Sequence, residues 1–415
     1  MNTNKQRILE WIDSQEDHLI QFLKELIRIP SDNPPGDCHK IAEYVHSSLQ
    51  NFGFLESSLL EVDEESVVKS GMIRTANVLA TTEFGAGAGP HVALNAHGDV
   101  VAPGLGWTYG PYGGEIVDGK MYGRGAAVSK SDIAAYTFAV LALKQFDEHL
   151  SGKTTLVFNF DEETGGENGP KWLLERGYIK PDLVISAGFT YSIVNSHNGC
   201  LHLEIKARGK SAHAAAPQSG VDAIEAMTGI MTALYEYRNS LHTIRSNVPG
   251  IESPTLNIGL ISGGINTNVV PDYCSIRIDR RLIPEEDGEI AQQDILRLIQ
   301  RQVEQCPGIQ VEVERVLYAR SLQPSAGQAT LVEAIQRNWN HVLNGNTPAV
   351  HGVPLYTDAR HFAEAGLPVV MFGAGPRTLV EANGHRADEH VRIDDLMSAT
   401  KIIAATLYDL LLLRN

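Results

Sequence analysis

Cysteine is scarce in this chain, and no two cysteines form a Cys-x-x-Cys pair. The 415 residues contain four of them: Cys38, Cys200, Cys274 and Cys306. Disulfide frameworks and structural zinc sites are usually recognised by closely spaced or regularly repeated cysteines. We therefore expect four reduced thiols in the protein core rather than disulfides or metal ligands, as is typical of a cytoplasmic protein.

Basic residues are also in short supply. Lysine and arginine number 34 against 50 aspartates and glutamates, which gives a net charge of −16. Nucleic acids and anionic membrane surfaces need a basic face, so neither is an expected partner. The chain has no apolar run long enough to span a bilayer, and its first residues lack the apolar core of a signal peptide. The expectation is a cytoplasmic protein with a small-molecule partner.

The chain is too long for one compact domain, and its first half alternates strands with helices. Apolar runs at 91–97, 154–160 and 181–186 are typical of buried strands, and 132–146 is typical of a helix between two of them. This alternation predicts an α/β fold, with a mostly parallel sheet covered by helices. Leu19, Ile20, Phe22, Leu23, Leu26 and Ile27 further predict an amphipathic helix that ends before a proline.

Near residue 200 the pattern changes to β-α-β-β-α-β. Strand-like runs cover 201–209, 255–264, 273–283 and 309–317, and helix-like runs cover 221–238 and 289–305. This order matches the ferredoxin-like split unit. The sequence therefore predicts an inserted ferredoxin-like α+β domain at 199–316. The first domain would then comprise 1–198 and 317–415.

Polar clusters follow two of the predicted parallel strands, where ligands usually bind in such sheets. His97 and Asp99 come at the end of one strand, and a carboxylate beside a histidine is typical of an oriented metal ligand. The alternative is a simple hydrogen-bonded pair. Glu162 and Glu163 belong to a run of three acids, which needs solvent, a cation or raised pKa values. The alternative is a solvated acidic loop.

Three further residues stand in polar or small-residue loops. His385 lies in "NGHRADEHV", where the alternative to a metal ligand is a turn histidine. Arg360 lies in "PLYTDARHF" and could bind a carboxylate in bidentate fashion, although a salt bridge with Asp358 is the rival interpretation. His213 lies among alanines in "GKSAHAAAP", where a surface histidine is the alternative.

Together these motifs resemble one family, the co-catalytic zinc peptidases and deacylases. That family includes aminoacylase, acetylornithine deacetylase, succinyl-diaminopimelate desuccinylase and glutamate carboxypeptidase. The resemblance runs through "LIRIPSDNPPGD", "AHGDVV", "YGRGA", "DEETGG", "GKSAHAAAP", "GGINTNVVPDYCSIRIDRR", "TDAR" and "GHRADEHV". It implies a zinc peptidase-like catalytic domain, a dimerisation domain, and two zinc ions that activate a water for attack on an amide.

The resemblance also implies residue roles. His97 would bind one metal with Asp99 orienting it, and Glu163 and His385 would bind the other. Glu162 would be the general base. His213 would cross the interface of a homodimer to polarise the scissile carbonyl. The substrate's carboxylate and backbone would be held by Asn268, Arg281 and Arg360.

Two ligands expected from the resemblance are missing. The family's bridging aspartate corresponds to Val128, and its terminal acid after the fourth strand corresponds to Gly188. Neither side chain can bind a metal, so the zinc centre is expected to hold one ion or none. Asp132, one helical turn beyond Val128, could replace the lost acid only if the loop moved.

Three hypotheses follow. The first is an amide hydrolase or deacylase with an incomplete metal centre, acting on a small N-acyl amino acid or dipeptide with a free carboxylate. The second is a metal-independent, non-hydrolytic enzyme that uses the retained base and histidines for proton transfer, isomerisation or elimination. The third is a non-catalytic protein that binds a small acidic ligand.

Overall fold

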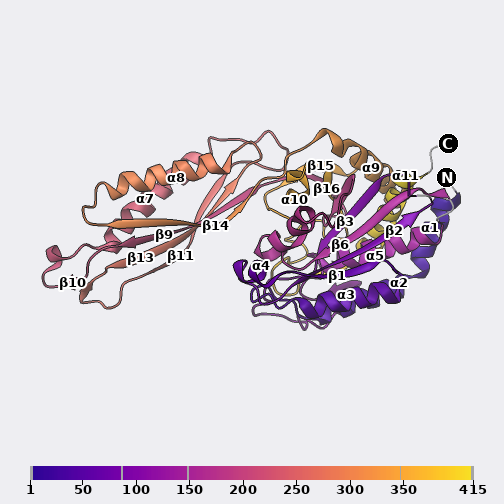
Figure 1. Cartoon of the computed structure of the whole chain (residues 1–415), viewed down its shortest axis with the longest axis horizontal. Helices are drawn as coiled ribbons and strands as arrows, with labels where there is room; N and C mark the ends of the chain where they lie inside the picture. Colours follow the sequence, from indigo (N-terminus) through magenta and orange to yellow (C-terminus); the bar gives the residue numbers. More distant parts are fainter. Residues whose placement is uncertain (1–2, 86, 147–148, 346, 413–415) are drawn as a thin grey trace. The chain divides into compact units, whose positions relative to one another are not determined.

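A computed structural model describes residues 3–85, 87–146, 149–345 and 347–412, which form two compact units (Figure 1). Unit 1 comprises Met1–Asn195, Pro324–His351 and Thr357–Asn415, and unit 2 comprises Ser196–Gln323 and Gly352–Tyr356. Within the described residues, no helix is both long enough and apolar enough to cross a membrane.

Unit 2 is slightly larger than the insert predicted at 199–316. His197 and Leu322 exchange two backbone hydrogen bonds of 3.1 Å. The segment that leads into the insert and the segment that leaves it are therefore paired with each other and belong to unit 2. The Gly352 amide donates to the Pro249 carbonyl at 2.7 Å, which attaches a short later segment as well. These pairings join residues far apart in the sequence, so local patterns gave no sign of them.

Unit 1 is built on an eight-stranded sheet whose four central strands are parallel. The strand order is β1-β2-β6-β3-β7-β16-β8-β15. Neighbours among β6, β3, β7 and β16 pair in parallel, whereas β1 with β2, β2 with β6 and β8 with β16 pair antiparallel. The predicted α/β fold with a parallel sheet is thus confirmed for the sheet centre. The strands are β1 (Ser57–Glu61), β2 (Ala76–Phe84), β3 (His91–His97), β6 (Gly152–Asn159), β7 (Leu183–Ser186), β8 (Ser192–His197), β15 (Ala349–Val353) and β16 (Val369–Met371).

Register places the carboxyl ends of the central strands at one edge of this sheet. His97 of β3 lies opposite Asn159 of β6, and Ser186 of β7 lies opposite Met371 of β16. Asn95 of β3 in turn lies opposite Ser186. The loops that leave these strands therefore start side by side, which is where parallel sheets hold ligands.

Helices cover the sheet of unit 1. Helix α5 is buried along almost its whole length, including Lys130 and Asp132, and it packs against α2, α11 and β3. Helix α2 buries five of the six predicted apolar residues, whereas Ile20 is only half-buried, and it ends at Arg28 before Pro30, as expected. The helices are α1 (Thr3–Ser14), α2 (Glu16–Arg28), α3 (His39–Asn51), α4 (Glu64–Lys69), α5 (Lys130–Lys144), α6 (Trp172–Glu175), α9 (Ala329–Leu343), α10 (Ala359–Glu364) and α11 (Ile393–Leu411).

A small three-stranded sheet positions the loop that contains Val128. Its order is β17-β5-β4, with bounds β4 (Glu115–Val117), β5 (Lys120–Tyr122) and β17 (His390–Arg392). Because Tyr122 pairs with His390, the start of the Val128 loop lies beside the residues that precede β17.

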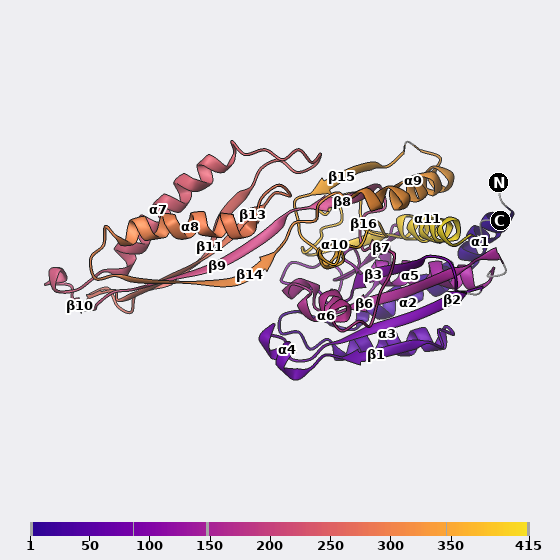
Figure 2. The ribbon, with the colours of Figure 1, turned by 45° about the horizontal axis from the view of Figure 1, so that its top comes forward.

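Unit 2 has the predicted ferredoxin-like order. Its four-stranded sheet runs β11-β13-β9-β14, and Figure 2 shows α7 and α8 together on one face. Along β9, Leu201, Leu203, Ile205 and Ala207 are buried under these helices, and the alternate residues point to the open face. The elements are β9 (Gly199–Arg208), α7 (Ala223–Leu241), β11 (Thr255–Gly263), β13 (Tyr273–Leu282), α8 (Gly288–Val303) and β14 (Gln310–Ala319).

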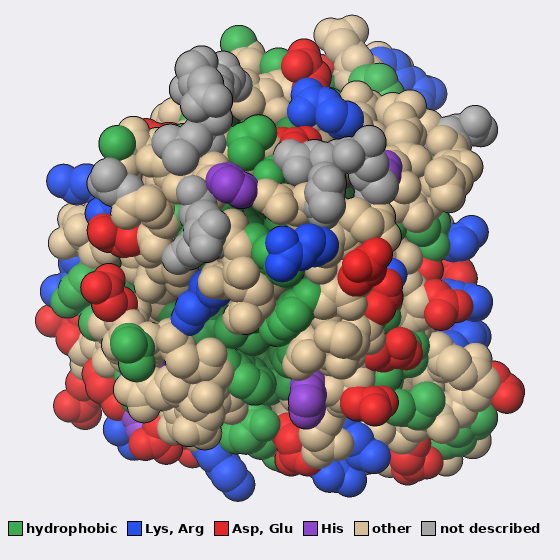
Figure 3. Space-filling view, turned by 90° about the vertical axis from the view of Figure 1, so that its right-hand side faces the viewer, with side chains coloured by type: hydrophobic (Ala, Val, Ile, Leu, Met, Phe, Trp, Pro, Cys, Tyr) green, Lys and Arg blue, Asp and Glu red, His purple; other side chains and the backbone are tan. Residues whose placement is uncertain are grey.

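The acidic net charge is not gathered into one field on the face of the molecule that Figure 3 shows. There, acidic and basic side chains are interspersed around the rim, with hydrophobic side chains between them (Figure 3). Mixed charge of this kind is typical of an ordinary solvated surface.

Candidate active site

The Asp99 carboxylate organises the strand ends of unit 1. Asp99 has no exposed surface, and its Oδ1 lies 3.3 Å from Nδ1 of His97. The backbone amides of Glu162 and Glu163 donate to its two oxygens at 3.2 and 3.0 Å, and the Asn33 side chain donates at 2.9 Å. One carboxylate thus fixes both the imidazole ring and the turn that carries two glutamates.

Imidazole and carboxylate groups converge in front of Asp99. Nε2 of His97 lies 3.9 Å from Oε2 of Glu162, and Nε2 of His385 lies 3.2 Å from Oε1 of Glu163. The potential ligand atoms of His97, Glu162 and Glu163 all lie within 4.8 Å of one another. The structure therefore brings together four residues that the sequence singled out separately.

This cluster carries more acid than base. Burial raises the pKa of Glu162 well above its ordinary value; the charge of His97 opposes this rise, and the carboxylate of Glu163 adds to it. Burial likewise raises the pKa of Asp358 to about 6. Burial disfavours charge on His97, but Glu162 and Asp99 outweigh it and raise the pKa of that ring. A bound cation would relieve the excess of negative charge, so the donor set suits a metal ion such as zinc.

Val128 and Gly188, the two positions where the resemblance expects acids, offer no ligand atom. Val128 presents an apolar side chain, and Gly188 presents none. At Gly188 a Cβ atom would lie 2.6 Å from the backbone nitrogen of Phe372 and 2.7 Å from the carbonyl carbon of Met371. The backbone therefore leaves no room for a side chain at position 188.

The side chain of Asp132, the possible replacement for the bridging acid, is hydrogen-bonded to the protein backbone. It is buried, and its Oδ1 accepts a hydrogen bond of 2.7 Å from the Ala374 amide. The same oxygen lies 1.7 Å from where a Cβ on Gly373 would be. Burial raises the pKa of Asp132 to about 7, although backbone hydrogen bonds from Ala374 and Gly188 oppose that rise. The carboxyl group joins the loops after β7 and β16.

A buried ion pair that the sequence analysis missed holds the Val128 loop. Nη1 of Arg124 lies 2.5 Å from Oε2 of Glu389, and neither side chain is more than 1% exposed. Oε1 of Glu389 accepts from the amides of Ala127 at 3.0 Å and Val128 at 3.2 Å. Both charged residues stand inside quoted motifs, and their opposite charges were the available signal.

Arg360 lies inside unit 1 rather than at its surface. Its guanidinium is 3% exposed and donates to the carbonyl of Gly165. Oxygens of Glu167 and Glu364 each lie 3.8 Å from its guanidinium nitrogens. The ion pairs of Arg360 are therefore with these two glutamates, whereas the rival interpretation expected a salt bridge with Asp358. Arg360 secures the glycine turn beside the glutamates, and a contact with substrate stays a prediction.

The other three predicted residues belong to unit 2. His213 is exposed on β10 (Ala212–His213), which pairs with β12 (Val269–Val270), and the Asn268 carbonyl accepts from Ala214 at 3.0 Å. Nε of Arg281 donates to Asp279 at 3.0 Å.

His213 and Asn268 lie at the opposite end of unit 2 from Arg281. In the register of β13 with β9, Tyr273 lies opposite Arg208, shortly before His213, and Arg281 lies opposite Cys200. The eight residue steps from Tyr273 to Arg281 span about 27 Å of strand. Within one copy of unit 2, a small substrate cannot contact both ends.

A parallel sheet with an imidazole–carboxylate cluster at its strand ends and a ferredoxin-like insert is the architecture of a metallopeptidase. The model of peptidase family M20/M25/M40 matches residues 93–409, and the chain belongs to that family.

Curated relatives extend over nearly the whole chain. It is 28% identical over 400 residues to a succinyl-diaminopimelate desuccinylase of Gluconacetobacter diazotrophicus, covering 94% of this chain and 96% of the relative. It is 28% identical over 369 residues to an acetylornithine deacetylase of Myxococcus xanthus, covering 88% and 90%. Among solved structures, a di-peptidase of Saccharomyces cerevisiae has the same fold, with a TM-score of 0.79, 14% identity and 98% coverage of each chain.

Replacing Asp99 by asparagine should destabilise unit 1. The amide would turn an N–H group toward donors that now share the carboxylate. We expect a loss of about 1–3 kcal/mol in the free energy of unfolding, measured with urea. The exposed Asp118→Asn is the matched control and should change little. Equal stability of the two variants would contradict the organising role of Asp99.

Gly188→Ala should also destabilise the protein, because its Cβ would collide with backbone atoms of Met371 and Phe372. We expect a cost of about 1–3 kcal/mol. Gly110→Ala is the control, since a Cβ there would meet nothing closer than 3.7 Å and the glycine is exposed. If thermal unfolding showed the two variants to be equally stable, position 188 would have room for an acid after all.

Proposed function

We propose that the chain is an amide hydrolase or deacylase acting at a centre that holds at most one metal ion. Its substrate would be a small N-acyl amino acid or dipeptide with a free carboxylate. The proposal rests chiefly on the Asp99 carboxylate, which presents His97, Glu162 and Glu163 together. Relatives named as a desuccinylase and a deacetylase support the substrate class.

Glu162 would carry the proton in this reaction. As a base it takes a proton from the attacking water, and as an acid it returns that proton to the leaving amine. Its burial and the neighbouring carboxylates favour proton uptake, and its backbone is tied to Asp99.

Glu163 and His385 would hold the single ion, with His97 as the third donor nearby. A zinc ion there would polarise the amide carbonyl and lower the pKa of a bound water. The Arg124–Glu389 pair keeps the Val128 loop in place although that loop supplies no ligand.

A homodimer would complete the substrate site. His213 and Asn268 lie beyond the Tyr273 end of β13, and Arg281 lies about 27 Å along that strand from Tyr273, which favours two copies of the chain each supplying one end. In this proposal His213 of the partner subunit polarises the scissile carbonyl, and arginines hold the substrate's carboxylate. A cytoplasmic location stays a prediction, supported by four cysteines that form no disulfide.

Metal content and the Glu162→Gln variant test the centre. The chain purified without chelator should bind at most one zinc per protomer by elemental analysis, and Glu163→Gln should bind less. Glu162→Gln should lower kcat for N-acyl amino acids by about 10²–10⁴-fold because the proton carrier is lost. The exposed Glu175→Gln is the control.

Other outcomes of that experiment discriminate between the hypotheses. Two zinc ions in the parent would contradict the incomplete centre. Undiminished turnover in chelator, with isomerised or eliminated products, would favour the metal-independent enzyme. Tight binding without turnover of any substrate would favour a binding protein.

Mixing two inactive variants tests the shared site. His213→Ala and Glu162→Gln should each be inactive alone. After unfolding and refolding together in equal amounts, about a quarter of the sites would combine an intact Glu162 with an intact His213 of the partner subunit. Activity should recover to about that fraction. No recovery, or a monomer by light scattering, would place His213 outside the partner's site.

A further inference from the structure

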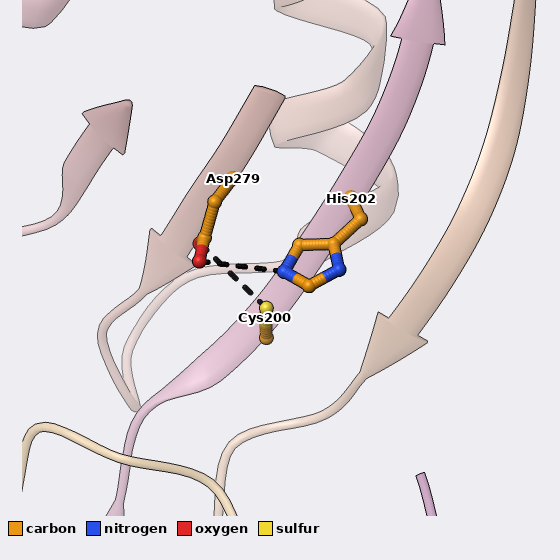
Figure 4. Close-up of side chains that lie close together, drawn as sticks. All are labelled: Cys200, His202 and Asp279. Atoms are coloured by element: carbon orange, nitrogen blue, oxygen red, sulfur yellow. Dashed lines mark hydrogen bonds and ion pairs between the residues drawn. The ribbon is translucent and has the colours of Figure 1, made fainter. Parts of the chain in front are cut away.

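Unit 2 contains a second group of metal-binding side chains: Cys200, His202 and Asp279 (Figure 4). Cys200 and His202 are two residues apart on β9, so both point to the sheet face opposite α7 and α8. Asp279 lies directly across from His202 on the neighbouring strand β13. This cluster shares no residue with the imidazole–carboxylate cluster of unit 1.

The spacing of these atoms suits a tetrahedral metal ion. Sγ of Cys200 lies 3.7 Å from Oδ1 of Asp279, and Nε2 of His202 lies 3.3 Å from Oδ2. All three ligand atoms lie within 4.8 Å of one another. Tetrahedral bonds of the usual zinc lengths separate a sulfur from an oxygen by about 3.6 Å and a nitrogen from an oxygen by about 3.4 Å. Only small side-chain shifts are therefore needed.

Burial and chemistry narrow the choice of ion. Cys200 has no exposed surface, whereas His202 and Asp279 remain 34% and 31% exposed at the side chain. The sulfur thus lies at the bottom of a site that solvent can enter, which leaves a place for a water ligand. Thiolate, imidazole and carboxylate together favour zinc or cobalt over magnesium or calcium.

In the structure, Arg281 provides the positive charge that pairs with the Asp279 carboxylate. Its Nε and Nη2 donate to the two carboxylate oxygens at 3.0 Å each, and its guanidinium lies over the ring of Tyr356 at 5.4 Å. Arg281 is also opposite Cys200 in the strand register. A metal ion bound to Asp279 would therefore compete directly with this arginine.

We propose that Cys200, His202 and Asp279 form a zinc-type metal site whose occupancy competes with the Asp279–Arg281 ion pair. Formation of the metal–sulfur bond breaks the S–H bond of Cys200, and the proton passes to solvent. The sequence analysis expected Cys200 to be a core thiol because it belongs to no Cys-x-x-Cys pair, and its partner acid lies 79 residues away along the chain.

Cobalt(II) titration of the metal-free full chain tests this proposal. A thiolate bound to cobalt gives a charge-transfer absorption that imidazole and carboxylate ligands do not, so the unit 1 cluster is silent in this band. We expect one such site per protomer, absent in Cys200→Ser and retained in Cys274→Ser, a buried cysteine control on the other face of β13. A missing band in the parent, or one that survives in Cys200→Ser, would overturn the proposal.

Two further variants keep Cys200 and test the other parts of the proposal through the Kd for cobalt. His202→Ala keeps the thiol and should weaken the cobalt Kd at least about tenfold, as expected for a lost ligand. Arg281→Gln removes the competing cation and should tighten the Kd by about 2- to 5-fold, since ion pairs of this kind are worth up to about 1 kcal/mol. An unchanged Kd in His202→Ala would overturn the site. A weaker Kd in Arg281→Gln would overturn the competition.

Discussion

The buried carboxylate of Asp99 is the interaction on which the rest of the candidate site depends. It receives hydrogen bonds from Asn33 and from the turn that carries Glu162 and Glu163, and it orients His97. A polar group without solvent contact is stable only when hydrogen-bond partners such as these surround it. Parallel pairing of β3 and β6 supplies this geometry, because it places the residues after both strands at the same edge of the sheet.

The loops around this centre are held by groups that do not bind metal. The Arg124–Glu389 pair fixes the Val128 loop, and Asp132 joins the loops after β7 and β16. These loops are therefore held in shape by contacts within the protein that need no metal ion.

Strand register also explains the second cluster. Antiparallel pairing of β9 with β13 sets Cys200, His202, Asp279 and Arg281 on one open face of the sheet. In the proposed site, Asp279 pairs either with Arg281 or with a metal ion. The net charge of this face would therefore depend on whether a metal ion is bound. Arg281 is also a proposed substrate contact. In these proposals, metal binding at Asp279 would affect substrate binding only by releasing Arg281 from its ion pair with Asp279.

The sequence by itself determined the classes of element and the chemistry at the strand ends. Apolar alternation predicted the parallel strands and the ferredoxin-like order, and the motifs predicted His97, Glu162, Glu163 and His385 as one group. Tertiary structure alone decided the partners of these groups. Glu389 holds Val128 from 261 residues away, and Arg360 is buried against Gly165. Periodicity reports which side of an element is buried, whereas contacts between distant segments depend on how the elements pack.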